Sequence, residues 1–275
     1  MTKLELNNEL LTGLLTGFIS NETKRIGLSK AVIGLSGGID SAVVAYLAAK
    51  ALGKRNVMCL IMPYKTSSPD SIEDAMKVVD SLKVPFRKED ITKPVDAVFE
   101  LSKGEEDSKV RMGNVMARIR MILLYDESAR CNGLVIGTGN KTEILLGYST
   151  IFGDAACAIN PVGDLYKTQL RSLARHLGVP ESILDKKPSA DLWKGQTDEG
   201  ELGFTYEEVD RYLYQKIDLR KSAEALRKSG FKDEFMNKVD RMVERNQFKR
   251  LPPLIAKVGK RTVNVDFRYN RDWKT

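Results

Sequence analysis

Short apolar runs alternate along this chain with stretches in which apolar residues recur every three or four positions. The short runs lie at 31–35, 57–62, 84–91 and 133–137. Each is nearly continuous, as is typical of a strand that is buried on both faces of a parallel sheet. Helical spacing fills the intervals at 38–53, 68–82 and 109–131. This alternation predicts an α/β fold with a doubly wound parallel sheet, right-handed crossovers and flanking helices.

Helical spacing also occurs near both ends of the chain. Residues 4–25 predict an amphipathic helix that packs on the sheet or against a partner subunit, with apolar positions at Leu10, Leu11, Leu14, Leu15, Phe18 and Ile19. Two more helix patterns, at 206–216 and 222–245, precede Leu251-Pro252-Pro253, and the basic, aromatic segment after Lys257 is expected to form an extended arm. We expect a single domain over residues 1–275 with helical additions at its N- and C-terminal ends.

Two polar, glycine-containing segments interrupt these patterns. Residues 102–107 predict a loop. Residues 188–203 are rich in Asp, Gly, Ser and Gln and are long for a simple connection, which favours an active-site lid.

Composition narrows the class of protein without choosing a function. The longest apolar runs stay well below the ~18 residues of a membrane span, and the N-terminus has no secretion signal, so we expect a cytoplasmic protein that does not bind membranes. Cys59, Cys131 and Cys157 have neither zinc-site nor CxxC spacing, which fits a reducing compartment. The net charge of +7 suits either nucleic acid or a small polyanionic substrate.

The turn after the first apolar run predicts a site for a polyphosphate. Gly37 and Gly38 let the backbone approach a ligand, and the following helix directs its N-terminal N–H groups to the same place. Asp40 stands where the lysine of a Walker A loop would be, so we expect Mg²⁺ between this carboxylate and the phosphates, while Ser36 and Ser41 add hydroxyl donors. The alternative is a glycine-rich turn without a ligand.

A second candidate follows the fourth apolar run, in the segment GTGNKTEILLGY at 137–148. Its glycine pattern alone is a weak dinucleotide signal because the third glycine is absent. Glu143, however, follows a strand whose carboxyl end lies at the same edge of the sheet as Asp40. Two such carboxylates could hold one or two Mg²⁺ ions on ATP, and a surface acid on a helix is the alternative for Glu143.

Four segments together resemble a known family. They are SGGIDSA, GNVMARIRMILLY, GTGNKTEILLGYSTIFGDAACAINPVGDLYKTQL and KPSADLWKGQTDE. SGGIDS resembles the pyrophosphate loop of the N-type ATP pyrophosphatases, and the four in this order resemble the ammonia-dependent NAD⁺ synthetases. The resemblance implies an adenine-nucleotide α-hydrolase-like, Rossmann-type fold and a homodimer. It also implies that ATP and ammonia convert deamido-NAD⁺ to NAD⁺ through an adenylate, with release of AMP and pyrophosphate.

The resemblance also implies roles for particular residues. The ATP-binding set is Gly34, Leu35, Ser36, Gly37, Gly38, Ile39, Asp40, Ser41, Thr138, Lys167 and Ser189. The magnesium set is Asp40 and Glu143, and the deamido-NAD⁺ set is Arg118, Tyr125, Asp154 and Lys249. Asp40 and Lys167 are the expected catalytic pair. A lysine outside the loop also makes sense chemically, because the loop lacks a Walker lysine to neutralise the leaving pyrophosphate.

Three positions depart from the family pattern. All three concern the deamido-NAD⁺ pocket, so the match to the family is weaker there than in the ATP site. Ile151, Ala158 and Phe248 stand where polar residues are common in the family.

An adenylating enzyme that modifies tRNA remains the alternative, favoured by the basic charge and the shared loop. No segment resembles a glutamine-hydrolysing domain, so free ammonia is the expected nitrogen donor, although a separate partner could supply it. His176 is the only histidine and is expected to be structural.

Overall fold

A four-stranded parallel sheet forms the centre of the molecule. The computed structural model describes residues 4–102, 109–189, 191 and 195–267. The strands are β1 (Lys30–Gly34), β2 (Val57–Ile61), β3 (Phe86–Lys88) and β4 (Gly133–Val135). Their order is β3-β2-β1-β4, all parallel, with Ala31 opposite both Val57 and Leu134. β2 and β3 extend the sheet on one side of β1, and β4 then pairs with β1 on its other side. This reversal of strand order beside β1 confirms the predicted doubly wound parallel sheet.

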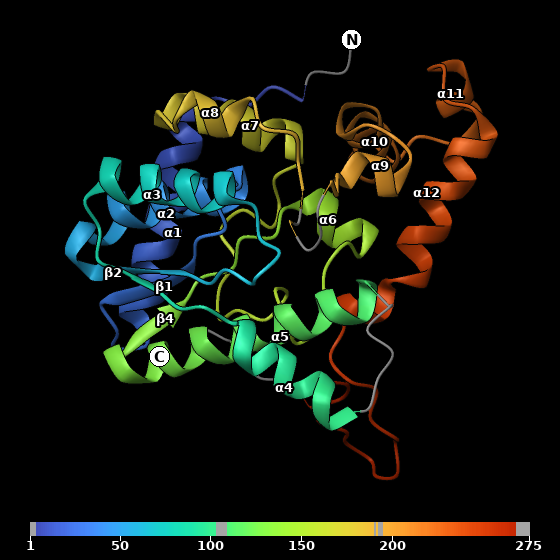
Figure 1. The fold of residues 1–275 in the computed structure, drawn as a ribbon. Coiled ribbons are helices and arrows are strands. Elements are labelled where there is room, and N and C mark those ends of the chain that lie inside the picture. The colour runs from blue at the N-terminus through green and yellow to red at the C-terminus, as the bar shows by residue number, and fades with distance from the viewer. Residues whose placement is uncertain (1–3, 103–108, 190, 192–194, 268–275) are drawn as a thin grey trace.

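Helices cover both faces of this sheet, as Figure 1 shows. On one face lie α1 (Asn8–Arg25), α2 (Ile39–Leu52), α3 (Pro69–Leu82) and α7 (Lys167–Leu177), and on the other lie α4 (Thr92–Ser102) and α5 (Lys109–Cys131). Successive side chains of β1 point to opposite faces, so Ile33 packs with the first group and Val32 with the second. Both are fully buried, which explains why the strands read as continuous apolar runs.

The first helix has two apolar faces. It begins at Asn8, where the Asn7 side chain caps the N–H groups of Glu9 and Leu10 at 3.1 Å. Leu15 and Ile19 are buried against the sheet layer, whereas Leu10 and Leu14 are 72% and 67% exposed. The outward face is thus available to another surface.

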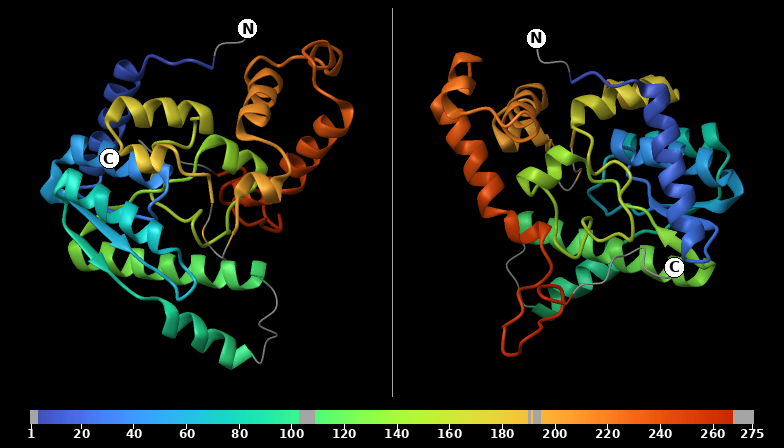
Figure 2. Two further views of the ribbon diagram at one scale, coloured as in Figure 1. Left: turned by 45° about the horizontal axis from the view of Figure 1, so that its top comes forward. Right: turned by 180° about the vertical axis from the view of Figure 1, so that it is seen from behind.

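A second group of helices stands beside the sheet and has its own apolar core. It comprises α6 (Lys141–Leu146), α10 (Tyr206–Leu213) with the π-helical turn η2 (Tyr214–Asp218), α11 (Ala223–Lys228) and α12 (Asp233–Arg245). Figure 2 shows from two further sides that α11 and α12 stay away from the strands. The shorter helices are η1 (Lys54–Asn56), α8 (Glu181–Leu184), α9 (Asp198–Leu202) and η3 (Gln247–Arg250). None of the helices in the described part of the chain is long and apolar enough to span a membrane.

Three sequence expectations about the elements need correction. The third strand is shorter than 84–91 because Pro85 has no N–H for the ladder and Asp90 caps the next helix by accepting from Thr92 N at 2.7 Å. That helix, α4, was not expected. The pattern at 222–245 forms two helices, separated near Gly230, whose φ of +94° ends the first one. Of the predicted loop at 102–107, Ser102 instead ends α4, and residues 103–107 lie outside the described residues.

Candidate active site

The predicted phosphate loop, residues 34–41, links β1 to α2 at the carboxyl edge of the sheet. Gly38 occupies the N-cap position of α2 and has no side chain that could cap this helix. The backbone N–H groups of the first turn can therefore donate to other acceptors. Serine hydroxyls hold the loop together: Ser36 N donates to Ser41 Oγ at 3.2 Å, and Ser41 Oγ donates to Gly38 O at 3.0 Å. The loop therefore has the form of an anion site built from backbone N–H groups and hydroxyls.

Gly37→Ala should destabilise the protein and abolish ATP binding. A Cβ at Gly37 would lie 2.0 Å from the carbonyl oxygen of Ser71, and the backbone has a φ of +78°. The matched control is Gly53→Ala, where φ is +84° but no heavy atom lies within 4 Å of the added Cβ. The control should lose roughly 1–2 kcal/mol of unfolding free energy from its φ alone. Urea denaturation and ATP titration calorimetry measure both effects, and equal losses would contradict the packing argument.

Lys167 joins the two predicted metal carboxylates. It is the first residue of α7, and its Nζ donates to Asp40 Oδ2 at 2.5 Å and to Glu143 Oε1 at 3.0 Å. The residue is only 2% exposed, and the ring of Tyr206 lies 5.2 Å from its ammonium. Three elements, α2, α6 and α7, thus bring one cation and two carboxylates to the end of the phosphate loop.

Asn140 is a further member of this cluster that the sequence reading did not identify. Its Nδ2 donates to Asp40 Oδ1 at 2.8 Å, and its Oδ1 accepts from the N–H of Glu143 at 3.0 Å. The backbone N–H of Asn140 in turn donates to Glu143 Oε2 at 3.3 Å, which completes a capping box for α6. The spacing N-x-x-E at 140–143 is the sequence signal that could have revealed it.

The charges in this cluster perturb one another strongly. Burial raises the pKa of Glu143, and the nearby Asp40 raises it further, while Lys167 opposes both. Burial alone would lower the pKa of Lys167, but Asp40 and Glu143 outweigh it, so the pKa of this lysine lies above its ordinary value. Lys167 therefore remains an ammonium. Titratable groups with such perturbed pKa values in a cavity are typical of functional sites.

A cavity of about 770 Å³ opens at this cluster. The predicted site residues that line it are Gly34, Leu35, Ser36, Gly38, Ile39, Asp40, Ser41, Thr138, Glu143, Asp154, Lys167, Ser189 and Lys249. Its wall also includes Gln196, Thr197 and Asp198 from the predicted lid at 188–203, of which residues 190 and 192–194 lie outside the described part. The expected ATP side and part of the expected acceptor side thus share one cavity.

The acceptor residues are less closely grouped. Lys249 Nζ donates to Gly147 O at 2.6 Å and to Ser149 O at 2.7 Å, and Asp154 Oδ1 accepts from Thr150 N at 2.8 Å, so both hold the loop after α6. Arg118 and Tyr125 lie on α5, are exposed, and do not line the cavity. Within one chain, the structure therefore brings two of these four residues to the cavity.

The three departures from the family pattern differ in their surroundings. Ile151 accepts from Arg118 Nη2 at 3.4 Å through its carbonyl oxygen, and Ala158 N donates to Val135 O at 3.0 Å. Phe248 is 57% exposed, beside Lys249 in η3. Its ring is therefore free to contact a ligand.

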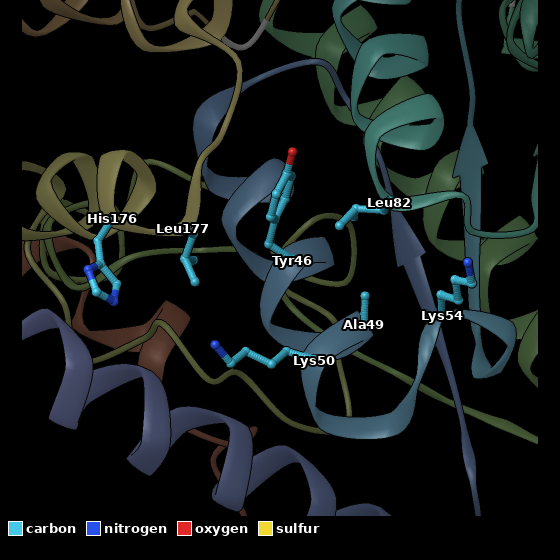
Figure 3. Close-up of a pocket in the computed structure, with 7 residues that line it drawn as sticks. All are labelled: Tyr46, Ala49, Lys50, Lys54, Leu82, His176 and Leu177. Atoms are coloured by element: carbon cyan, nitrogen blue, oxygen red, sulfur yellow. The ribbon is translucent and has the colours of Figure 1, made fainter.

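A smaller cavity of about 410 Å³ lies elsewhere, between α2, α3 and α7 (Figure 3). It is lined by Tyr46, Ala49, Lys50, Lys54, Leu82, His176 and Leu177. None of the predicted site residues is among them. His176 is thus remote from the Asp40 cluster.

Comparison with known proteins identifies a family for this chain. The sequence model of NAD synthase matches residues 12–253. The chain belongs to the NAD synthase family. The resemblance noted from the four sequence segments is thereby confirmed, and the parallel sheet with its flanking helices is the fold of this family.

Individual members of the NAD synthase family align with this chain over nearly its whole length. An NH(3)-dependent NAD(+) synthetase from Chlorobium phaeovibrioides is 54% identical over 271 residues, which is 98% of this chain and 97% of the relative. Among solved structures, the NMN synthetase from Francisella tularensis has a TM-score of 0.83 and 34% identity, covering 92% of this chain and 99% of its own. The NH3-dependent NAD synthetase from Campylobacter jejuni has a TM-score of 0.77 and 36% identity, covering 92% and 100%.

Proposed function

We propose that this protein is an ammonia-dependent ligase that amidates deamido-NAD⁺ to NAD⁺ at the expense of ATP. The observation that carries the proposal is the Asp40–Lys167–Glu143 cluster at the end of a phosphate loop, inside a cavity of about 770 Å³. A cavity of this size lies in the range that holds small-molecule ligands. The relative from Chlorobium phaeovibrioides, named for the same activity, supports it.

The reaction has two steps. The nicotinate carboxylate attacks the α-phosphorus of ATP, the bond between the α-phosphorus and the bridging oxygen breaks, and its electron pair leaves with pyrophosphate. Ammonia then attacks the acyl carbon of the resulting acyl-adenylate, the bond from this carbon to the phosphate oxygen breaks, AMP departs with its electron pair, and the nitrogen loses a proton. Adenylylation thus turns the carboxylate oxygen into part of a good leaving group, AMP.

The residues of this chain contribute mainly by positioning and by charge. The loop from Gly34 to Ser41 binds the phosphates, with Thr138 and Ser189 as further ATP contacts. Lys167 supplies positive charge to the reacting phosphates and keeps Asp40 and Glu143 together. Because backbone N–H groups and buried ion pairs are already in place, little reorganisation is needed when charge develops.

Mg²⁺ fits the donor set at this place. Asp40 and Glu143 already gather around a cation, the Lys167 ammonium, and their side chains are 19% and 17% exposed toward the cavity. Within the described residues no group of three or more His, Cys, Asp or Glu side chains could hold a metal, so phosphate oxygens and water would complete the shell. When bound, the ion would neutralise phosphate charge.

Product analysis tests the proposal. Mass spectrometry of a reaction with ATP, Mg²⁺, ammonium and deamido-NAD⁺ should detect NAD⁺, AMP and pyrophosphate; ADP and phosphate would contradict it. The similarity to an NMN synthetase makes nicotinic acid mononucleotide the second acceptor to compare. Unmodified tRNA as acceptor tests the remaining alternative, and we expect no product from it.

Arg118→Ala should raise the KM for deamido-NAD⁺ about 10-fold or more, with little change in the KM for ATP, because a charged hydrogen bond is worth roughly 1.5–3 kcal/mol. We propose that Arg118 and Lys249 bind the acceptor's phosphates and that the exposed ring of Phe248 stacks on one of its rings. The control is Arg111→Ala, on the same helix and also outside the cavity of this chain, where the guanidinium packs 5.4 Å from the centre of the Phe99 ring and has no proposed ligand contact. Unchanged deamido-NAD⁺ kinetics in Arg118→Ala would contradict the assignment.

We also propose that the protein works as a homodimer. The outward face of α1 exposes Leu10 and Leu14, and α5 exposes Ile122 and Tyr125 at 54% and 40%. Such surfaces are typical of interfaces between subunits. Light scattering at micromolar concentration should give twice the chain mass of 30.8 kDa, and a fully active monomer would contradict it.

A further inference from the structure

The N-terminal turn of α3 packs directly on the phosphate loop. Gly37 approaches Ser71 so closely that a Cβ at Gly37 would lie 2.0 Å from the Ser71 carbonyl oxygen. Ser71 is itself 6% exposed and lines the same cavity as Gly38 and Asp40. A side chain bound to Ser71 is therefore also close to the phosphate loop.

Lys186 is that side chain. It follows α8, and its Nζ donates to Ser71 Oγ at 3.1 Å and to Asp74 Oδ2 at 3.1 Å. The side chain is 28% exposed and lines the cavity. An ammonium has three N–H donors, and these two contacts leave one for a ligand.

Asp74 holds Lys186 in this position. Its side chain is 6% exposed and also accepts from Lys77 Nζ at 3.0 Å and from Ser182 Oγ at 2.9 Å. Burial alone would raise the pKa of Asp74, but the hydrogen bonds from Lys77, Lys186 and Ser182 lower it, so the carboxylate stays ionised. The network ties the chain after α8 to α3 and hence to the phosphate loop.

The charges around the phosphate loop favour a further cation at this place. Lys167 is shared between Asp40 and Glu143, so that cluster formally carries one more negative than positive charge. Lys77 pairs with Glu73 at 3.4 Å as well as with Asp74, so its charge is balanced away from the cavity. A polyphosphate in the loop would be repelled by the first group, and Lys186, which lines the cavity, is the cation on the α3 side of the loop that can offset this repulsion.

We propose that Lys186 is a further phosphate-binding residue, which contacts the β- and γ-phosphates of ATP and stabilises the leaving pyrophosphate. Asp74 and Ser71 act as its positioning residues. The proposal rests on the proposed function, since it assigns Lys186 to the pyrophosphate half of the same ATP. It places beside the loop the positive charge that a Walker lysine supplies from within it.

The matched pair of variants is Lys186→Met and Lys77→Met. Both remove a lysine paired with Asp74 at nearly the same distance, but only Lys186 lines the cavity. Lys186→Met should lower kcat/KM for ATP about 10- to 100-fold, as expected for one charge-assisted hydrogen bond, and leave the KM for deamido-NAD⁺ unchanged. Lys77→Met should stay close to wild type. Lys186→Arg should recover much of the activity, because it keeps the charge and the reach.

A binding measurement separates this inference from the proposed function. Calorimetric titration with inorganic pyrophosphate and Mg²⁺ needs no turnover, and Lys186→Met should bind about 10- to 100-fold more weakly than wild type. Equal effects of Lys186→Met and Lys77→Met on this affinity, or none from Lys186→Met, would overturn the assignment. Formation of ADP by the wild type would instead overturn the proposed function. Thermal unfolding of each variant excludes loss of fold as the cause, since Asp74 keeps one lysine in each.

Discussion

Asp40→Asn should lower kcat about 10²- to 10³-fold, the effect expected when one preorganised charge at a reacting centre is removed. The substitution keeps the shape of the side chain. Its remaining oxygen can still accept from Asn140 Nδ2, and Lys167 keeps Glu143 as a partner at 3.0 Å. The fold should therefore survive. Glu143→Gln should behave in the same way, because a glutamine also completes the capping box of α6.

Circular dichroism tests whether the fold survives, and steady-state rates over a range of Mg²⁺ concentrations measure the loss in kcat. Asp80→Asn is the control, an exposed acid in α3 whose loss should leave kcat unchanged. Near-normal turnover of Asp40→Asn at limiting Mg²⁺ would show that this carboxylate neither holds a metal nor positions Lys167.

Lys167→Met should cost about 3–5 kcal/mol of unfolding free energy as well as most of the activity, because it leaves two largely buried carboxylates without their cation. Methionine matches the length of the lysine stem, so the loss would come from charge rather than from packing. The side chain is 3% exposed and makes both ion pairs of the cluster. Urea denaturation gives the stability change.

Two comparisons identify charge as the cause. Lys228→Met removes an exposed helix pair with Glu224, whose side chains are 75% and 74% exposed, and should cost no more than about 0.5 kcal/mol. Adding Asp40→Asn to Lys167→Met should restore part of the stability, because one uncompensated carboxylate then disappears. Simple additivity of the two losses would contradict the ion-pair argument.

Most of the fold could be predicted from local patterns. The strands at β1, β2 and β4 and the helices at α2, α3 and α5 appear where their periodicity placed them. The errors arose where a single residue or a weak pattern decided the outcome: Pro85 shortened β3, Gly230 divided the helical pattern at 222–245, and the short helix α4 was not expected. Periodicity averages over many residues, so it is insensitive to such points.

Local patterns in the sequence were enough to predict the parallel α/β architecture and a glycine-rich loop with Asp40, and four separate segments indicated the family. Parallel-sheet geometry also predicted that Asp40 and Glu143 lie at the same edge, but the direct side-chain pairs became known from the packing of distant elements. Lys167 lies 127 residues from its partner Asp40, and Lys186 lies 112 residues from Asp74. A hydrogen bond depends on tenths of an ångström between side chains carried by different elements, and packing of those elements, not their local pattern, sets such distances.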